Sequence, residues 1–191
     1  MPWCPRCATA ISQHEIVTDG YAELTHRSVT LRFPLRDRPG ESLLIWTTTP
    51  WTLTSNVAAA VGPDLSYVKV QVEIKTSKGN EDHILYLSKG TLAMLRGDYK
   101  VLEELQGSEM EGWTYDGPFD DLTAAQTAGG VTELKELKEG VTQSASEAHQ
   151  VILWDEVGEE EGTGIVHIAP GCGAEDFLLS KETILPRVAP L

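Results

Sequence analysis

Residues 42–56 read SLLIWTTTPWTLTSN. The apolar run predicts a buried strand over Ser42–Thr48, and Pro50 should end it because proline lacks an N–H group and biases the preceding residue to extended geometry. The hydroxyl and freed N–H groups of the following turn would suit a carboxyl, ester or phosphate group bound by neutral hydrogen bonds. The alternative is a threonine-rich run that only caps a helix at Thr52 or Ser55.

Segments on either side of this stretch carry the two-residue alternation of β-strands. The alternation is clearest at Tyr67–Lys75, where apolar residues alternate with Lys, Gln and Glu. Shorter strands are predicted at Tyr21–His26, Ser28–Leu35, Val57–Val61, His83–Leu87, Val151–Trp154 and Gly164–Ala169. Helical segments are predicted at Lys89–Arg96, Glu133–Glu139 and Gly173–Ser180, a loop over 106–130, and a solvated acidic loop over Glu156–Glu161. This order predicts a mainly β domain, either a barrel or a sandwich, decorated by helices.

Composition and charge exclude several classes of protein. Hydrophobic residues make up 41% and charged residues 23% of the 191 residues, which excludes disorder, collagen and coiled coil. The net charge of −14 argues against a domain that binds nucleic acid mainly by neutralising phosphates, but allows a few contacts to a nucleic-acid end. No apolar run approaches the roughly 20 residues of a membrane-spanning helix, and we expect no signal peptide because residues 1–10 contain no apolar segment. Three cysteines, an odd number, favour a reducing compartment, so we expect a cytoplasmic protein without membrane contact.

Two of the cysteines form half of a zinc knuckle. They lie in Trp3-Cys4-Pro5-Arg6-Cys7, and two thiolates at this spacing can bind one tetrahedral zinc ion. Four ligands are needed, and neither Cys172 nor the histidines have an obvious pairing with them. We therefore expect Cys4 and Cys7 to be a possible half-site only, without a metal in this chain.

A second motif, GTGIVHIAPGCGAED at 162–176, places one histidine on a strand between turn-forming residues. His167 faces opposite to Val166 and Ile168, and a lone strand histidine is more often structural than catalytic. Asp176 opens a predicted helix, where it is either a favourable helix-terminus charge or a carboxylate aimed at an ammonium group. Phosphate-loop motifs are absent, and so are the nucleophile elbow and the zinc-protease motif.

Together the two motifs resemble the editing domain of isoleucyl-tRNA synthetase, its connective peptide 1 region. Residues 46–53, WTTTPWTL, are close to diagnostic, and 162–176 resembles the second editing motif. The knuckle at 4–7 fits the zinc-binding strand at the start of that insertion. The resemblance covers nearly the whole chain, although 106–150 is poorly matched and Thr54 stands where the family usually has proline.

The resemblance implies a closed or nearly closed β-barrel with peripheral helices over 16–191, after a partial zinc knuckle and linker strand at 1–15. It implies post-transfer editing, in which a domain of an ATP-dependent isoleucine–tRNA ligase hydrolyses the ester of valine attached to isoleucine tRNA. A second site is needed because one methylene changes binding by only about 1–3 kcal/mol, a range for which valine and isoleucine are the standard example. The implied partners are the tRNA 3′ end carrying valine and the rest of the synthetase. No cofactor is implied in this domain, and zinc is possible in the full-length enzyme.

The resemblance also implies roles for two sets of side chains. The set implied for catalysis at the ester and terminal adenosine is Thr47, Thr48, Thr49, Asn56 and Asp176. The set implied for binding the valyl group is Trp51, Thr52, His167 and Asp176. Asp176 would hold the α-ammonium group, His167 would block isoleucine, and Thr52 with Asn56 would shape the pocket and place water. The implied chemistry is attack by water in a preorganised site, without a covalent enzyme intermediate.

Two other functions fit the same residues. A zinc-ribbon β module could bind RNA or a protein partner without catalysis, and the acidic charge favours a protein partner. A free-standing hydrolase would cleave small aminoacyl compounds without tRNA.

Overall fold

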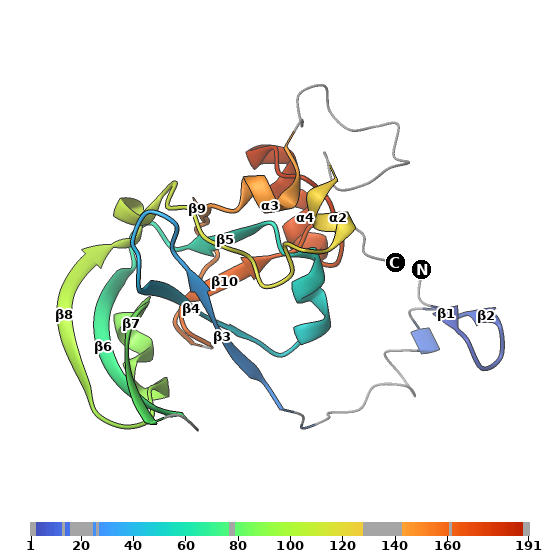
Figure 1. Ribbon diagram of the computed structural model, residues 1–191. Helices are drawn as coiled ribbons and strands as arrows, with labels where there is room; N and C mark the ends of the chain where they lie inside the picture. The colour runs from blue at the N-terminus through green and yellow to red at the C-terminus, as the bar shows by residue number, and fades with distance from the viewer. Residues whose placement is uncertain are drawn as a thin grey trace.

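The computed structural model describes residues 3–12, 14–15, 25, 27–76, 79–127, 143–160 and 162–188 (Figure 1). Its strands are β1 (Trp3–Cys4), β2 (Thr9–Ala10), β3 (Val29–Pro34), β4 (Glu41–Thr47), β5 (Ala58–Val61), β6 (Ser66–Thr76), β7 (Gly79–Ser88), β8 (Tyr99–Gln106), β9 (Val151–Leu153) and β10 (Ile165–Ile168). The α-helices are α2 (Thr123–Gln126), α3 (Ala145–Ala148) and α4 (Ala174–Thr183). The 3₁₀ helices are η1 (Pro50–Ser55), η2 (Lys89–Met94) and η3 (Gly107–Met110).

The described strands form three sheets. The largest has the order β3-β4-β7-β6-β8, the second has the order β10-β5-β9, and β1 pairs with β2 alone. Neighbouring strands are antiparallel except for the β4–β7 and β5–β9 pairs, which are parallel. In Figure 1 the long strands β6, β7 and β8 curve on one side, while β5, β9 and β10 lie beside the helices on the other.

The expected closed barrel is wrong, because the described strands make no closed sheet. The five-stranded sheet has free edges at β3 and β8, and β5 belongs to a separate sheet. Pro50 explains this division: β4 stops at Thr47, the chain turns into η1, and it re-enters as β5 beside β10 and β9. The mainly β character with few helices is confirmed.

Tyr67 joins the two larger sheets. Its buried hydroxyl donates to the carbonyl oxygen of Gly164 (2.6 Å) and accepts from the backbone N–H of Gly62 (2.9 Å). Burial raises the pKa of this phenol to about 12, so it remains a donor at neutral pH. Beside it, the backbone N–H of Ser88 donates to the carbonyl of Thr163 (2.8 Å). These bonds connect β6 and β7 to the segment that leads into β10.

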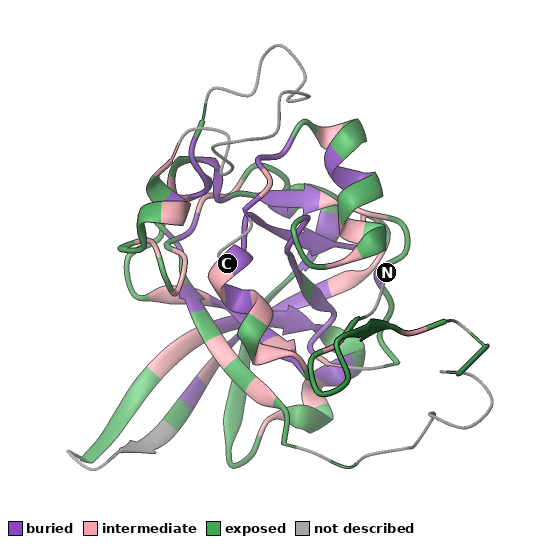
Figure 2. Ribbon diagram, turned by 90° about the vertical axis from the view of Figure 1, so that its right-hand side faces the viewer, coloured by how far each residue is buried: buried purple, intermediate pink, exposed green. Residues whose placement is uncertain are grey.

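Apolar side chains form three buried clusters. Figure 2 colours the buried residues purple, and they lie on strands, helices and loops. The first lies between the two larger sheets and includes Phe33, Leu43, Ile45, Tyr86, Val61 and Ile165. The second joins the three-stranded sheet to α4 and includes Ala58, Ala60, Ile168, Leu179 and Val188. The third includes Val68, Val70, Val72, Leu85 and Leu87. Leu92 and Leu95, at η2, pack against this third cluster, so the large sheet is covered on both faces over part of its area.

Most strands expected from alternation or apolar runs are confirmed within a few residues. Within the two larger sheets the exception is β8, which was not predicted because most of its side chains are exposed and its sequence does not alternate. The helix expected at Lys89–Arg96 is the 3₁₀ helix η2, and the loop expected at 106–130 contains η3 and α2. The expected strand at Tyr21–His26 lies outside the described residues except for Thr25, and Glu133–Glu139 lies wholly outside them.

The β1–β2 hairpin falls within the expected N-terminal segment 1–15, and the division at residue 15 stays a prediction. Among the described residues, no helix is long and apolar enough to span a membrane.

Candidate functional site

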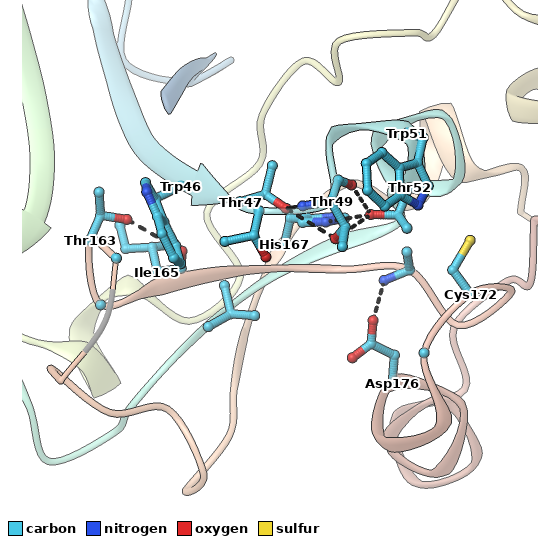
Figure 3. A pocket seen from close by; sticks show the side chains of 16 residues that line it. Trp46, Thr47, Thr49, Trp51, Thr52, Thr163, Ile165, His167, Cys172 and Asp176 are labelled. Carbon is cyan, nitrogen blue, oxygen red and sulfur yellow. Dashed lines mark hydrogen bonds between the residues drawn. The ribbon is translucent and has the colours of Figure 1, made fainter. Parts of the chain in front are cut away.

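A cavity of about 560 Å³ lies where the two sequence motifs meet (Figure 3). One wall is the end of β4 with the start of η1, contributing Trp46, Thr47, Thr48, Thr49, Trp51 and Thr52. The opposite wall contributes Gly162, Thr163, Gly164, Ile165, Val166, His167, Ala169, Cys172, Gly173 and Asp176. The fold therefore brings the predicted threonines, tryptophan, histidine and aspartate into one cavity.

Three threonine hydroxyls form a short polar row along the first wall. Thr49 precedes η1, whose first residue is Pro50, and its backbone N–H donates to Thr47 Oγ1 (3.1 Å). The Thr52 hydroxyl donates to the Thr49 carbonyl oxygen (2.8 Å). The Oγ1 atoms of Thr47 and Thr49 are 3.3 Å apart, and those of Thr49 and Thr52 are 3.4 Å apart. The strand end and the 3₁₀ turn thus fix the hydroxyls relative to one another.

His167 faces this row from β10, where it pairs with Ala59 of β5. Its Nε2 lies 3.0 Å from Thr52 Oγ1. Because the Thr52 proton is directed to the Thr49 carbonyl, Nε2–H is the donor, and Nδ1 then carries the lone pair. Nδ1 is buried without a hydrogen-bond partner among the described residues, and the side chain is only 8% exposed. Burial lowers the pKa of His167 to about 4, so the ring is neutral at pH 7.

Asp176 supplies the negative charge of the cavity from the first turn of α4. Its Oδ2 accepts a hydrogen bond from the backbone N–H of Ala169 (2.8 Å), which fixes the carboxylate against the turn that precedes the helix. Burial raises the pKa of this carboxyl group. Gly173 leaves room for it, because a Cβ atom there would lie 3.0 Å from Asp176 Cγ. A half-buried carboxylate of this kind favours a cationic ligand, which would restore its charged form.

Thr48 and Trp51 lie at the exposed side of the cavity. Thr48 is exposed, and the Trp51 side chain is 68% exposed on η1 (Figure 3). An aromatic ring that is this exposed beside a cavity is available to a ligand, since the core does not use it.

Asn56, which was also expected at the site, is not among the residues that line this cavity. Its side-chain N–H donates to the Ala58 carbonyl (3.0 Å), and its Oδ1 accepts from the Tyr115 hydroxyl (2.8 Å). The side chain is buried at the junction of η1 and β5. These contacts support the backbone next to the site, so Asn56 is left out of the reacting groups.

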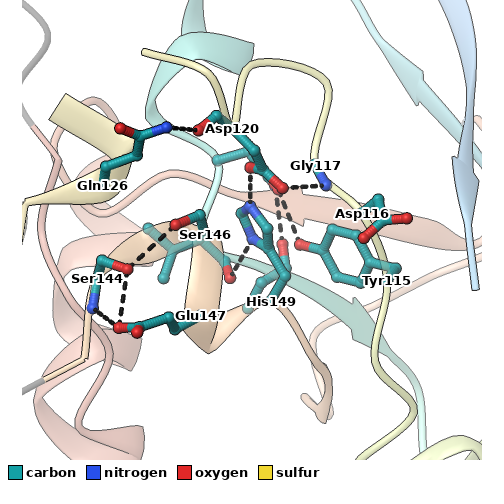
Figure 4. A network of polar contacts seen from close by, with 12 residues as sticks. Tyr115, Asp116, Gly117, Asp120, Gln126, Ser144, Ser146, Glu147 and His149 are labelled. Atoms are coloured by element: carbon teal, nitrogen blue, oxygen red, sulfur yellow. Dashed lines mark hydrogen bonds and ion pairs between the residues drawn. The ribbon is translucent and has the colours of Figure 1, made fainter. Parts of the chain in front are cut away.

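The same junction is held by a polar network that the sequence reasoning missed (Figure 4). The buried His149 places Nδ1 3.0 Å from the Val57 carbonyl oxygen and Nε2 2.7 Å from Asp120 Oδ1, and its ring stacks on Tyr115 at 4.9 Å. Asp120 also accepts from the backbone N–H of Gly117 (2.9 Å). Apart from Val57, the residues of this network lie within 106–150, where no sequence motif indicates that they contact one another.

Sequence reasoning also assigned no role to Trp46 or to the glycines of the second motif. Gly162 and Gly164 have φ of +75° and +70°, a backbone region that favours glycine. A Cβ atom on Gly162 would lie 2.8 Å from the Trp46 ring, so this glycine lets the two walls approach. The two glycines just before β10 are the feature of the sequence from which this close approach of the walls could have been predicted.

The N-terminal knuckle brings two thiols together. Cys7 Sγ donates to Cys4 Sγ (2.9 Å) across the turn between β1 and β2, and this bond lowers the pKa of Cys4. No group of three or more His, Cys, Asp or Glu side chains that could hold a metal occurs among the described residues. The described donors thus fit half of a tetrahedral zinc site.

Comparison with known proteins places the chain within larger relatives. It is 41% identical to an isoleucine–tRNA ligase of Pyrococcus abyssi over 193 residues, 38% identical to that of Thermobifida fusca over 195, and 37% identical to that of Methanocaldococcus jannaschii over 196. These alignments cover 99%, 100% and 99% of this chain, but only 16%, 16% and 17% of the relatives. The chain is therefore homologous to a segment of isoleucine–tRNA ligases. No protein-family model matches it.

Two solved structures share the fold. The crystal structure of GlLeuRS-CP1 gives a TM-score of 0.57 at 14% identity, covering 83% of this chain and 60% of that chain. The P. knowlesi cytosolic leucyl-tRNA synthetase editing domain gives 0.53 at 13% identity, covering 75% and 52%. The architecture is thus that of a synthetase editing domain.

Proposed function

We propose that this chain is the editing domain of an isoleucine–tRNA ligase and that it hydrolyses the ester joining valine to isoleucine tRNA. One observation carries the proposal: the cavity brings a row of threonine hydroxyls, a neutral imidazole and a carboxylate together, from two motifs of a chain homologous to those ligases. The groups suit an aminoacyl ester, which offers an ammonium group, a carbonyl and ribose hydroxyls.

In this proposal Asp176 binds the α-ammonium group of the amino acid. Its Oδ2 is fixed by Ala169, so the carboxylate has one orientation before the substrate arrives. Binding an ammonium group favours the charged carboxylate and offsets the effect of burial, which raises its pKa. This contact would anchor the amino acid while its ester lies near the threonines.

His167 and Trp51 would bound the space for the amino-acid side chain. His167 is neutral and bonded to Thr52, so it presents a fixed, uncharged ring to an apolar group. An additional methylene would have to displace that ring. Rejection of isoleucine would therefore be steric and does not require an ionised group.

The hydroxyls of Thr47, Thr48 and Thr49 would contact the ester and the terminal ribose. Water adds to the ester carbonyl carbon, the bond from that carbon to the ribose oxygen breaks, and the ribose oxygen takes a proton, which releases valine and tRNA. Hydroxyl donors near the carbonyl oxygen would stabilise the charge that develops on it. Such positioning by neutral groups needs no covalent intermediate.

The wider context is also proposed. The tRNA 3′ end carrying valine and the remainder of the ligase would be the partners, and the cytoplasmic location stays a prediction. A zinc ion bound by Cys4 and Cys7 would need further ligands from elsewhere in the full-length enzyme, and its contribution would be structural.

The test is Asp176→Asn, which keeps the shape of the side chain and removes its charge. In a titration with a non-hydrolysable valyl-adenosine analogue, affinity should fall at least about 30-fold, because losing one partner of a desolvated charge pair costs roughly 2–5 kcal/mol. Hydrolysis of valyl-tRNA(Ile) should fall with it. Glu182→Gln is the matched control, since this carboxylate of the same helix is exposed and does not line the cavity.

An affinity within about twofold of the unmodified chain would leave Asp176 as a helix-terminus charge and refute the proposed site. Binding of RNA or a protein partner without any hydrolysis would instead favour the non-catalytic module. Cleavage of valyl-adenosine esters without any response to tRNA would favour the free-standing hydrolase.

A further inference from the structure

We propose that Glu159 is a positioning residue that holds the glycine-rich wall of the cavity, Gly162–Gly164, at its binding distance from Trp46. The proposal rests on the proposed function, because the wall matters only if the cavity binds a substrate. Glu159 lies outside both sequence motifs, in a stretch expected to be a solvated acidic loop. Glu159 is exposed, as expected for that loop, but its carboxylate is also bonded to another part of the fold.

The carboxylate lies where β7 ends and η2 begins. Its Oε1 accepts hydrogen bonds from the Ser88 hydroxyl and from the backbone N–H of Gly90 (3.1 Å). Ser88 is fully buried, so one of the two donors is fixed in the core. Gly90 fits closely, because a Cβ atom there would lie 2.6 Å from Glu159 Oε2. The absence of a side chain at residue 90 therefore leaves the space that the carboxylate occupies.

This contact is the outermost of three that join the large sheet to the cavity wall. Further along the chain, the Thr163 carbonyl accepts from the backbone N–H of Ser88 (2.8 Å), and the Gly164 carbonyl accepts from the Tyr67 hydroxyl (2.6 Å). Ser88 thus holds Glu159 through its hydroxyl and Thr163 through its backbone. Val157, buried in the second cluster, anchors the chain before this segment, and the Glu159 contact is a further anchor between Val157 and Thr163.

Thr163 is buried and, like Gly164, has its carbonyl bonded, so Gly162 is the residue of the wall that gains most from a contact just before it. Gly162 and Gly164 have no side chains to pack, and glycine gives the backbone its greatest conformational freedom. Gly162 lies against the Trp46 ring, which forms the facing wall, so a shift of this segment changes the width of the cavity there. Hydrogen bonds to a charged acceptor are stronger than those between neutral groups, which suits a carboxylate for this position.

The experiment compares three variants with a matched control. Glu159→Ala removes the acceptor, and Gly90→Ala displaces it without changing the acid. Glu159→Gln keeps a neutral acceptor oxygen as the conservative variant. Glu160→Gln is the control, because it removes the same charge one residue along from an exposed side chain that does not line the cavity.

We expect Glu159→Ala and Gly90→Ala to weaken binding of the valyl-adenosine analogue about tenfold, which corresponds to about 1.4 kcal/mol. In hydrolysis of valyl-tRNA(Ile), KM should rise by a similar factor while kcat stays within about threefold, since no reacting group has changed. Glu159→Gln should recover at least half of the loss on a logarithmic scale, and Glu160→Gln should match the unmodified chain.

Amide hydrogen exchange gives a measurement that does not depend on the function. Peptides covering 162–166 should exchange faster in Glu159→Ala than in the unmodified chain, while peptides from β6 should not change. Unchanged exchange at 162–166, or a fall in thermal midpoint with unchanged Kd and KM, would overturn the proposal. If the unmodified chain neither binds nor hydrolyses its substrates, the proposed function fails, and the exchange result alone decides the positioning role.

Discussion

Acid should destabilise this fold through His167. The residue is 8% exposed, and the buried Nδ1 of its ring has no hydrogen-bond partner among the described residues that would stabilise a second proton. Burial lowers the pKa from 6.5 to about 4 in the folded chain, whereas in the unfolded chain the ring titrates near its ordinary value. Between these two values the unfolded chain binds a proton that the folded chain does not. The free energy of unfolding therefore keeps its full value well above pH 6.5 and decreases as the pH drops from 6.5 toward 4.

The size of the effect follows from the two pKa values. The loss of stability should be about 1 kcal/mol at pH 5.5 and about 2–3 kcal/mol at pH 4.5, approaching about 3 kcal/mol at still lower pH. Asp176 acts in the opposite direction, because burial raises its pKa and the folded chain then binds a proton more readily than the unfolded chain. The comparison must therefore be made against a variant that keeps Asp176.

His167→Gln provides that comparison, since glutamine can still donate to Thr52 but does not titrate. Urea unfolding of both proteins, followed by tryptophan fluorescence at pH 7.5, 6.5, 5.5 and 4.5, gives the difference in stability at each pH. The unmodified chain should lose about 1 kcal/mol more than the variant between pH 7.5 and 5.5. Parallel curves would mean that His167 is solvated in the folded chain. A relative gain by the unmodified chain would mean that its imidazolium form has a partner, and either result would refute the reasoning.

Three further predictions concern the sheet junction, the knuckle and specificity. Tyr67→Phe leaves the N–H of Gly62 and the carbonyl of Gly164 without their partner, so urea unfolding should show a loss of about 1–3 kcal/mol, while Tyr99→Phe, at an exposed ring, should be neutral. A metal chelator should leave the unfolding midpoint unchanged, because two knuckle thiols alone add little folding energy; a stoichiometric zinc ion whose removal unfolds the chain would contradict this. His167→Ala should shift the preference for valyl over isoleucyl esters by about 1–3 kcal/mol, measured as the ratio of their hydrolysis rates, and an equal collapse of both rates would exclude steric rejection.

A strand could be predicted where its own residues alternate between apolar and polar or form an apolar run. The alternation of Tyr67–Lys75 marks β6, and the apolar run before Thr47 marks β4. β8 lies at an exposed sheet edge, where neither face imposes an alternation, so it was missed. The closed barrel was wrong for a related reason, because alternation shows which face of a strand is buried but not which strand pairs with its edge.

The site could be predicted in part because both of its motifs are continuous in the sequence. The threonine row depends on local bonds around Pro50, which the residues themselves indicate. The direction of Asn56 depends instead on Ala58 and on Tyr115, 59 residues away, and no local pattern shows that contact. Glu159 was hidden in the same way, since its donors lie 69 to 71 residues earlier in the chain.

The two walls of the cavity come from distant parts of the sequence, and this separation affects how the protein folds. Thr52 and His167 are 115 residues apart in the sequence, and β10 pairs with β5 across a similar separation. Contacts between such distant residues form late, because closing a long loop costs chain entropy before any contact stabilises it. A chain emerging from the ribosome has β4, η1 and β5 long before it has β10. Under the proposed function, ligand binding therefore begins only when β10 has docked, and its recovery after dilution from urea measures that step of folding.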